Sequence, residues 1–258
     1  MMDISYLGLL FSMLLLIFPL FIFHQLKLKL SKQLMISFGR MIGQLALIGL
    51  WLQFLLDQEN LGLTLLWVVI MLVNAIITLR GRLKYKRRIL FPVLFSALGI
   101  ASLVVMPWIL FMVVRPDPFF SAKFVIPIYG MVLGNSMNSC ALALERFESG
   151  LSDNWKAYYT RISLGANIWE AALPPFRKAM HASLMPQLLT IASMGVVSLP
   201  GMMTGQILGG SSAIVAIKYQ MMVMAAIFSA VALADFIAIR LYLAKRFDKY
   251  YMPIKDIK

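Results

Sequence analysis

Long apolar stretches alternate with short polar segments along most of the chain. A helix needs about 20 predominantly apolar residues to cross the hydrocarbon core of a bilayer. Stretches of this kind predict seven membrane-spanning helices, near residues 4–23, 34–56, 61–79, 89–114, 122–144, 184–208 and 213–239. The predicted fold is an all-α polytopic membrane protein in which residues 1–258 form a single transmembrane domain. No positive segment precedes the first stretch and no cleavage site follows it, so we expect a retained span rather than a signal peptide.

Basic residues gather in every second polar segment. Of the 24 Lys and Arg residues, 20 lie within residues 24–33, 80–88, 145–181 and 240–258. The positive-inside rule assigns these segments to the cytoplasm, which places the N-terminus outside and the C-terminus inside the cell inner (plasma) membrane. Asp235, Arg240 and Arg40 lie near the cytoplasmic edge of their spans, where snorkelling or local pairing would explain them.

Composition agrees with this topology. Hydrophobic residues make up 61% of the chain and charged residues 14%, against roughly 45–50% and about 25% in soluble domains. The net charge of +13 does not indicate nucleic-acid binding, because the basic residues follow the loops instead of forming a face with exposed aromatic residues. The single cysteine, Cys140, cannot form an internal disulfide and is expected to be a small buried hydrophobe.

The longest polar segment, residues 145–181, is predicted to be cytoplasmic and helical. Trp155, Tyr158, Ile162 and Leu164 recur at nearly helical spacing between polar residues. Amphipathic helices of this kind lie on a membrane surface or dock on a soluble partner.

Several motifs do not occur in the sequence. It contains no G-x-x-x-x-G-K-[ST] motif for nucleotide binding, no H-E-x-x-H motif and no pair of carboxylates within a span. These features predict a protein that is not an enzyme and that binds no cofactor of its own.

The sixth predicted span is interrupted by Pro186, Pro200 and Gly201. A re-entrant hairpin here would violate the charge rule, so a crossing is preferred. A kinked packing helix is one interpretation. The other is a broken helix that lines a translocation pathway, formed by Pro200, Gly201, Met202, Met203, Thr204, Gly205 and Gln206.

The fifth predicted span is rich in polar residues, of which Asn135, Asn138 and Cys140 are assigned to the same pathway. Amides are costly to bury in hydrocarbon, so this helix should face protein or water. Met137, Met202 and Met203 are candidate soft metal ligands, although methionine also packs well as core filler.

Residues 163–169 read SLGANIW, which resembles the L-G-A-S-x-W core of the coupling loop in ABC-transporter permeases. Leu164, Gly165, Ala166 and Trp169 match this pattern, and Asn167 stands where Ser is common. Three further blocks, NSMNSCALALERF, IWEAALPPFRKAMHASLMP and SLPGMMTGQILGGSSAIVAIKYQ, resemble the FetB-like iron-export permease family, which is related to plant aluminium-tolerance membrane proteins.

This resemblance implies a permease that exports metal ions, chiefly iron. It implies a cytoplasmic ATP-binding subunit as the partner, with ATP and Mg bound there, and a homodimer of permeases in membrane lipid. The residues expected to couple to the ATPase are Leu164, Gly165, Ala166, Trp169, Glu170, Phe176, Arg177 and Lys178, with Trp169 and Phe176 as apolar anchors inside a charged rim. The alternative function is a stand-alone secondary carrier or channel for a small solute or ion.

Overall fold

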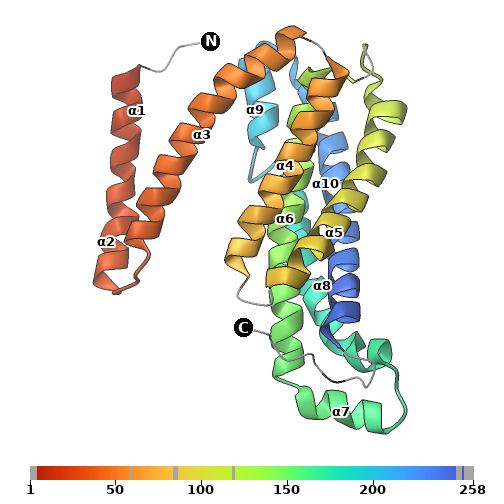
Figure 1. Ribbon diagram of the computed structural model, residues 1–258. Helices are drawn as coiled ribbons and strands as arrows, with labels where there is room; N and C mark the ends of the chain where they lie inside the picture. The colour runs from red at the N-terminus through yellow and green to blue at the C-terminus, as the bar shows by residue number, and fades with distance from the viewer. Residues whose placement is uncertain (1–4, 59, 84–86, 118–119, 248–251, 253–258) are drawn as a thin grey trace. The chain divides into compact units, whose positions relative to one another are not determined.

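The computed structural model describes residues 5–58, 60–83, 87–117, 120–247 and 252 (Figure 1). These residues form helices joined by short turns, and no strand occurs among them. The chain divides into two compact units, residues 1–59 and residues 60–258. The all-α fold is therefore confirmed. The basic residues Lys84 and Lys86 and those after position 247, which were predicted to be cytoplasmic, lie outside the described residues.

The first unit consists of two long helical stretches. The first contains α1 (Tyr6–Met13), a 3₁₀ turn (Leu14–Leu16) and α2 (Ile17–Gln25), and the second is α3 (Ser31–Gln58). The Ser5 hydroxyl caps α1 by accepting a hydrogen bond from the Gly8 amide at 3.1 Å. Large apolar side chains of this unit, such as Phe18 and Leu47, are exposed, as expected of helices that lipid surrounds.

The second unit contains the remaining helices. These are α4 (Leu61–Arg82), α5 (Arg87–Trp108) with a π-helical extension (Ile109–Val114), α6 (Ala122–Ser152), α7 (Trp155–Ser163), α8 (Ile168–Ser193), α9 (Gly201–Leu208) and α10 (Ala213–Arg246). Helix α7 lies at the end of the bundle where α6 terminates (Figure 1).

Helices α6 and α10 form the centre of this unit. Helix α10 packs against α5, α6, α8 and α9, and α6 packs against α4 and α8 as well. Four alanines of α10, namely Ala226, Ala230, Ala234 and Ala238, are buried at intervals of four residues. Small side chains on one helix face allow neighbouring backbones to approach closely. The alanine face therefore explains why so many helices can pack around α10.

Within the part of the chain that the structure describes, five segments are long and apolar enough to cross a membrane: Leu7–Gln25, Ser31–Gln58, Leu61–Gly81, Ile89–Val114 and Ala213–Arg246. They confirm five predicted spans as apolar helices. Helix α6 covers the predicted span 122–144 without interruption but is not one of these five segments, consistent with its polar composition. The total of seven crossings stays a prediction.

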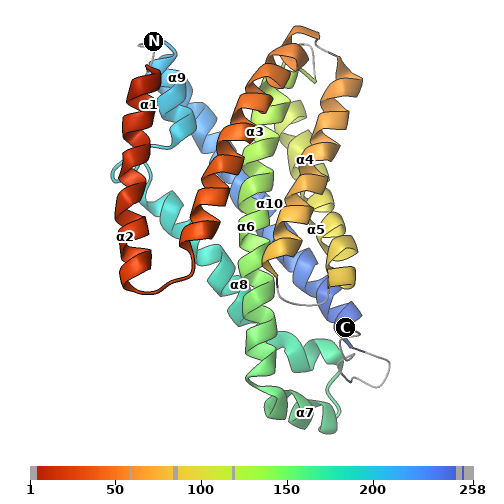
Figure 2. The same cartoon turned by 60° about the vertical axis from the view of Figure 1, so that its left-hand side comes forward.

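The predicted span over residues 184–208 is interrupted, which agrees with the interpretation as a broken helix and not with that as a continuous kinked helix. Helix α8 ends at Ser193 and α9 begins at Gly201. Pro200 disfavours helical backbone at Leu199, and Gly195 adopts a φ of +87° that glycine tolerates best. Figure 2 shows α9 following α8 toward the end of the unit at which α10 begins.

Candidate functional site

A rigid corner, residues 164–167, joins α7 to α8. The Asn167 side chain accepts a hydrogen bond from the Glu170 amide, and the Glu170 carboxylate accepts one from the Asn167 amide, both at 2.9 Å. This capping box satisfies backbone donors at the start of α8. Gly165 has a φ of +91°, a left-handed conformation that disfavours side chains. The sequence therefore specifies both the turn and the beginning of the helix.

The corner presents Leu164 to its surroundings with 82% of its surface exposed. Ala166 and Trp169 are half-buried, whereas Glu170, Arg177 and Lys178 are exposed. Leu164 is an exposed apolar side chain with exposed neighbours at Ser163 and Gly165. The corner thus has an apolar tip and a charged rim. Leu164 forms this tip, whereas Trp169 and Phe176 were expected to be the apolar anchors.

Trp169 and Phe176 contact each other instead of forming two outward anchors. Their ring centroids are 4.8 Å apart. Phe176 is only 5% exposed and also contacts Phe147 and Phe236. A side chain buried in its own chain cannot insert into a partner, which corrects the expectation that Phe176 is an anchor. Its position indicates that it supports Trp169 from behind.

Arg240 lies over the Trp169 ring, with its guanidinium carbon 4.3 Å from the ring centroid. This distance is typical of a cation–π interaction. Arg240 was expected to snorkel or to pair locally near the edge of its span. It instead links the end of α10 to the start of α8, so the corner is coupled to the central helix of the unit.

Helix α7 is attached to the end of α10 by aromatic stacking. The Tyr158 ring stacks on Phe247 at 5.0 Å, and Trp155 contacts Phe247 at 6.1 Å. Tyr158 and Phe247 are both buried. Helix α7 is therefore packed against the folded core. The corner and the bundle form one packed structure.

Two hollows lie beside α9. The first, of about 340 Å³, is lined by Met202, Gly205 and Gln206 of α9 together with residues of α6 and α10, including Phe124 and Tyr219. In it the Gln206 Oε1 atom is buried without a hydrogen-bond partner. An unpaired buried acceptor lowers stability unless something binds it, so Gln206 contributes an unsatisfied polar atom at this hollow.

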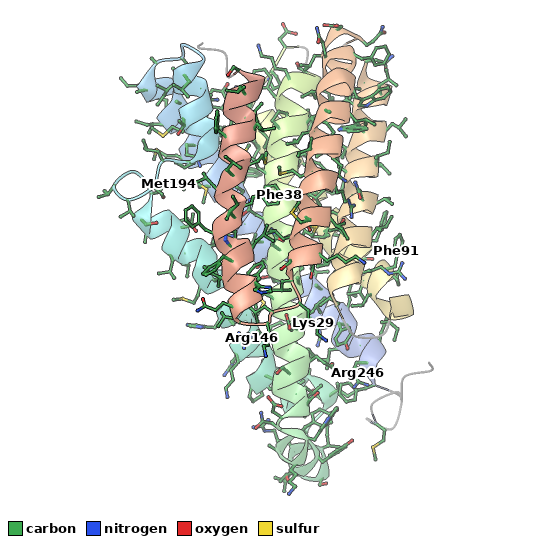
Figure 3. All side chains as sticks on the ribbon, turned by 90° about the vertical axis from the view of Figure 1, so that its left-hand side faces the viewer. Lys29, Phe38, Phe91, Arg146, Met194 and Arg246 are labelled. Atoms are coloured by element: carbon green, nitrogen blue, oxygen red, sulfur yellow. The ribbon has the colours of Figure 1, made fainter. Side chains whose placement is uncertain are left out.

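The second hollow, of about 610 Å³, lies by the break between α8 and α9. It is lined by Met194, Met203, Met221 and Met224, among other residues, with Gln220. The Gln220 amide reaches the Met194 sulfur at 3.8 Å, and Figure 3 places Met194 at the end of α8. Met203 lines this hollow whereas Met202 lines the first.

The other predicted pathway residues are distributed over α6 and the start of α9. Asn135 accepts a hydrogen bond from Gln187 of α8 at 3.3 Å, and the Thr204 hydroxyl donates to the Pro200 carbonyl at 3.1 Å. Asn138 is exposed. Met137 lines neither of the two hollows. The predicted metal set Met137, Met202 and Met203 is therefore not gathered around either hollow.

A buried carboxylate lies on α10. Asp235 is 0% exposed, which excludes snorkelling and leaves local pairing, the other expectation from the sequence. Its Oδ2 atom accepts a hydrogen bond from the Ser139 hydroxyl at 2.6 Å, and Cys140 lies beside it. A lone acid within the apolar stretch 213–239 was the available signal, because ionisable residues inside a membrane usually have a function.

These features define a multi-helix membrane protein with a broken helix in its bundle and a folded corner at one end. The chain belongs to the family described as "Uncharacterised protein family (UPF0014)", whose sequence profile matches residues 6–247. No solved structure matches it.

The chain is similar to several named proteins. A UPF0014 membrane protein from Synechocystis is 36% identical over 76% of both chains. The probable iron export permease protein FetB from Escherichia coli is 30% identical over 96% of this chain and 94% of its own. The protein ALUMINUM SENSITIVE 3 from Arabidopsis thaliana is 31% identical over 87% of this chain and 81% of its own. The resemblance inferred from the sequence is confirmed at the level of the family.

Proposed function

We propose that this chain is the permease subunit of an ABC transporter that exports metal ions, with ATP hydrolysed on a separate cytoplasmic subunit. The observation that carries the proposal is the rigid corner with the exposed Leu164 at its tip. The corner offers a cytoplasmic ATPase subunit an apolar contact, and the capping box at the start of α8 holds that contact in a fixed position. The similarity to a protein named as a probable iron export permease supports the direction and the cargo.

Force applied at the corner would reach the bundle through three connections. Trp169 and Arg240 connect α8 to α10, Tyr158 and Phe247 connect α7 to the end of α10, and Glu148 and Arg246 connect α6 to α10. Closure of two ATPase subunits on ATP and Mg would then move these helices together as a rigid body. The hollows beside α9 would open alternately to the two sides.

The working unit in this proposal contains two permeases and two ATP-binding subunits. Each permease crosses the cell inner membrane seven times, with α6 and the pair α8–α9 as the fifth and sixth crossings. The N-terminus lies outside and α7 lies in the cytoplasm. A broken helix pair that crosses the bilayer is tolerated where it is buried in protein or lines a cavity, which fits the hollows on either side of α9.

Co-purification with an ATP-binding subunit, followed by measurement of ATPase activity, tests this function. Leu164→Asp should abolish stimulation of the ATPase by the permease, because a charge replaces the apolar contact. Trp169→Ala should reduce the stimulation strongly, because it removes the support behind the corner. Trp108→Ala, which changes an exposed tryptophan of α5, is the matched control.

Metal content measured in cells with and without the gene under iron load tests the cargo. We expect more cell-associated iron without the gene. An unchanged content would contradict iron export. If no ATP-binding subunit associates and transport persists without ATP, the stand-alone carrier is the correct function.

A further inference from the structure

The Asp235 carboxylate lies where three helices of the second unit meet. Its Oδ2 atom accepts a hydrogen bond from the Ser139 hydroxyl of α6, 2.6 Å away. The same hydroxyl oxygen is 3.2 Å from the backbone carbonyl oxygen of Ser183 in α8. Asp235, on α10, is 0% exposed. Removing an ionised carboxylate from water costs several kcal/mol, so a purely structural helix contact would be made more cheaply by apolar residues.

One oxygen atom of the Asp235 carboxylate has no hydrogen-bond partner. The Oδ1 atom of Asp235 is buried without a partner. Ser139 has one hydroxyl proton, so it cannot donate to the Asp235 carboxylate and the Ser183 carbonyl at once. The Ser183 and Cys140 side chains also adjoin the carboxylate, yet its Oδ1 atom forms no hydrogen bond with either. A bound cation would satisfy this arrangement.

The available donor atoms suit a divalent transition metal. Cys140 lies beside the Asp235 carboxylate and is fully buried, so a sulfur atom adjoins the oxygen atoms. Carboxylate, hydroxyl and carbonyl oxygens bind hard cations, whereas a thiolate favours softer transition metals over Mg²⁺ and Ca²⁺. A mixed set of oxygen and sulfur donors is therefore selective for the cargo class of the proposed function.

The position of the cluster suits a loading site. Asp235 precedes Arg240 by five residues, which is about 8 Å along a helix. Arg240 contacts Trp169 at the proposed ATPase corner. A movement of that corner would separate α8 from α10 close to the carboxylate. Asp235 and Cys140 are both fully buried, so the cluster is closed in this conformation.

We propose that Asp235, Ser139, Cys140 and the Ser183 carbonyl form a binding site for the transported divalent metal ion, reached when α8 and α10 separate. This inference rests on the proposed metal transport and names the residues that would hold the cargo. It differs from the methionine assignment made from the sequence, because it places the metal at a buried carboxylate and thiol.

Binding of Co²⁺ to the full chain in lipid nanodiscs tests the site, because cobalt absorption reports sulfur ligation. We expect wild type to bind Co²⁺ with a sulfur-to-metal charge-transfer band. Asp235→Asn, which keeps the shape of the side chain, should weaken binding at least about tenfold. Cys140→Ser should remove the charge-transfer band while oxygen ligation persists. Asp153→Asn, which changes an exposed acid directly after the end of α6, is the matched control.

Size-exclusion profiles establish that each variant is folded, and Ser139→Ala is the second variant if Asp235→Asn aggregates. Wild-type affinity and an unchanged band in both Asp235→Asn and Cys140→Ser would overturn the site. So would a loss of thermal stability in Asp235→Asn with no change in affinity. If the metal-site proposal is wrong, the permease should still stimulate the ATPase. Conversely, Co²⁺ binding at Asp235 would survive if no ATP-binding subunit were found.

Discussion

Arg246 at the end of α10 binds Glu148 of α6, with Nη2 of the guanidinium 3.0 Å from Oε1 of the carboxylate. The Tyr242 hydroxyl donates a second hydrogen bond to Oε2 at 3.0 Å. The Glu148 side chain is 5% exposed and that of Arg246 14%. The pair connects the two central helices, α6 and α10, at the end where α7 attaches. Figure 3 shows Arg246 toward this end.

Arg246→Ala should destabilise the protein by about 3–5 kcal/mol, because it leaves the buried Glu148 charge without its partner. Thermal unfolding in detergent measures the loss. The double variant Glu148→Gln/Arg246→Gln should recover much of the stability, since no unpaired charge remains. Equal stability of Arg246→Ala and wild type would show that water reaches Glu148.

Gly165→Ala should cost about 1–2 kcal/mol, because a φ of +91° forces the new side chain into an unfavourable backbone conformation. The strain falls on the coupling corner, so stimulation of an ATP-binding subunit should decline together with stability. Both are measured on the purified complex.

The control for this change is Gly134→Ala. Gly134 lies within α6 with open space around its missing side chain, so alanine should be neutral or slightly stabilising there. The same loss of stimulation in both variants would contradict a special role for the corner.

Gln206→Met should leave stability unchanged or raise it, because it removes an amide oxygen that is buried without a partner. Transport should fall, because the first hollow beside α9 loses the amide that Gln206 contributes to its lining. Melting temperature and metal efflux from vesicles are measured on the same preparation. Loss of stability with unchanged efflux would show that the amide is structural.

Cysteine labelling maps the sidedness of the chain. Cys140 is the single cysteine and is fully buried, so wild type should not react with a membrane-impermeant maleimide. Leu164→Cys should react only from the cytoplasmic side. Ser211→Cys, at the exposed turn between α9 and α10, should react only from outside. Labelling of both positions from one side would contradict the predicted crossing by α8 and α9.

Much of the fold could be predicted from the lengths of the apolar stretches in the sequence. Five predicted spans coincide with helices that are apolar enough to cross a bilayer, because lipid imposes a minimum length and forbids charge over that length. The break before α9 was also visible, since Leu199 precedes Pro200. The sequence did not predict that α8 would extend without interruption from the polar corner to Ser193, because Pro174, Pro175 and Pro186 argue against a continuous helix.

The candidate site was predicted less well. Leu164 and Gly165 form an exposed corner, but Phe176 is buried because its ring packs against Trp169, Phe147 and Phe236. Hydrophobicity alone does not distinguish an anchor for a partner from a core residue. The partner of Asp235 was not predicted for a related reason. Counting residues to the membrane edge says nothing about whether the side chain faces lipid, water or a serine on another helix.

The capping box between Asn167 and Glu170 has a further consequence. A flexible loop would lose conformational entropy when a partner bound to it, and that loss would weaken association. The first turn of α8 is already fastened by two reciprocal hydrogen bonds. In the proposed function, a small apolar contact at Leu164 would therefore suffice to bind a partner repeatedly. Little of each movement of that partner would be lost to bending of the corner.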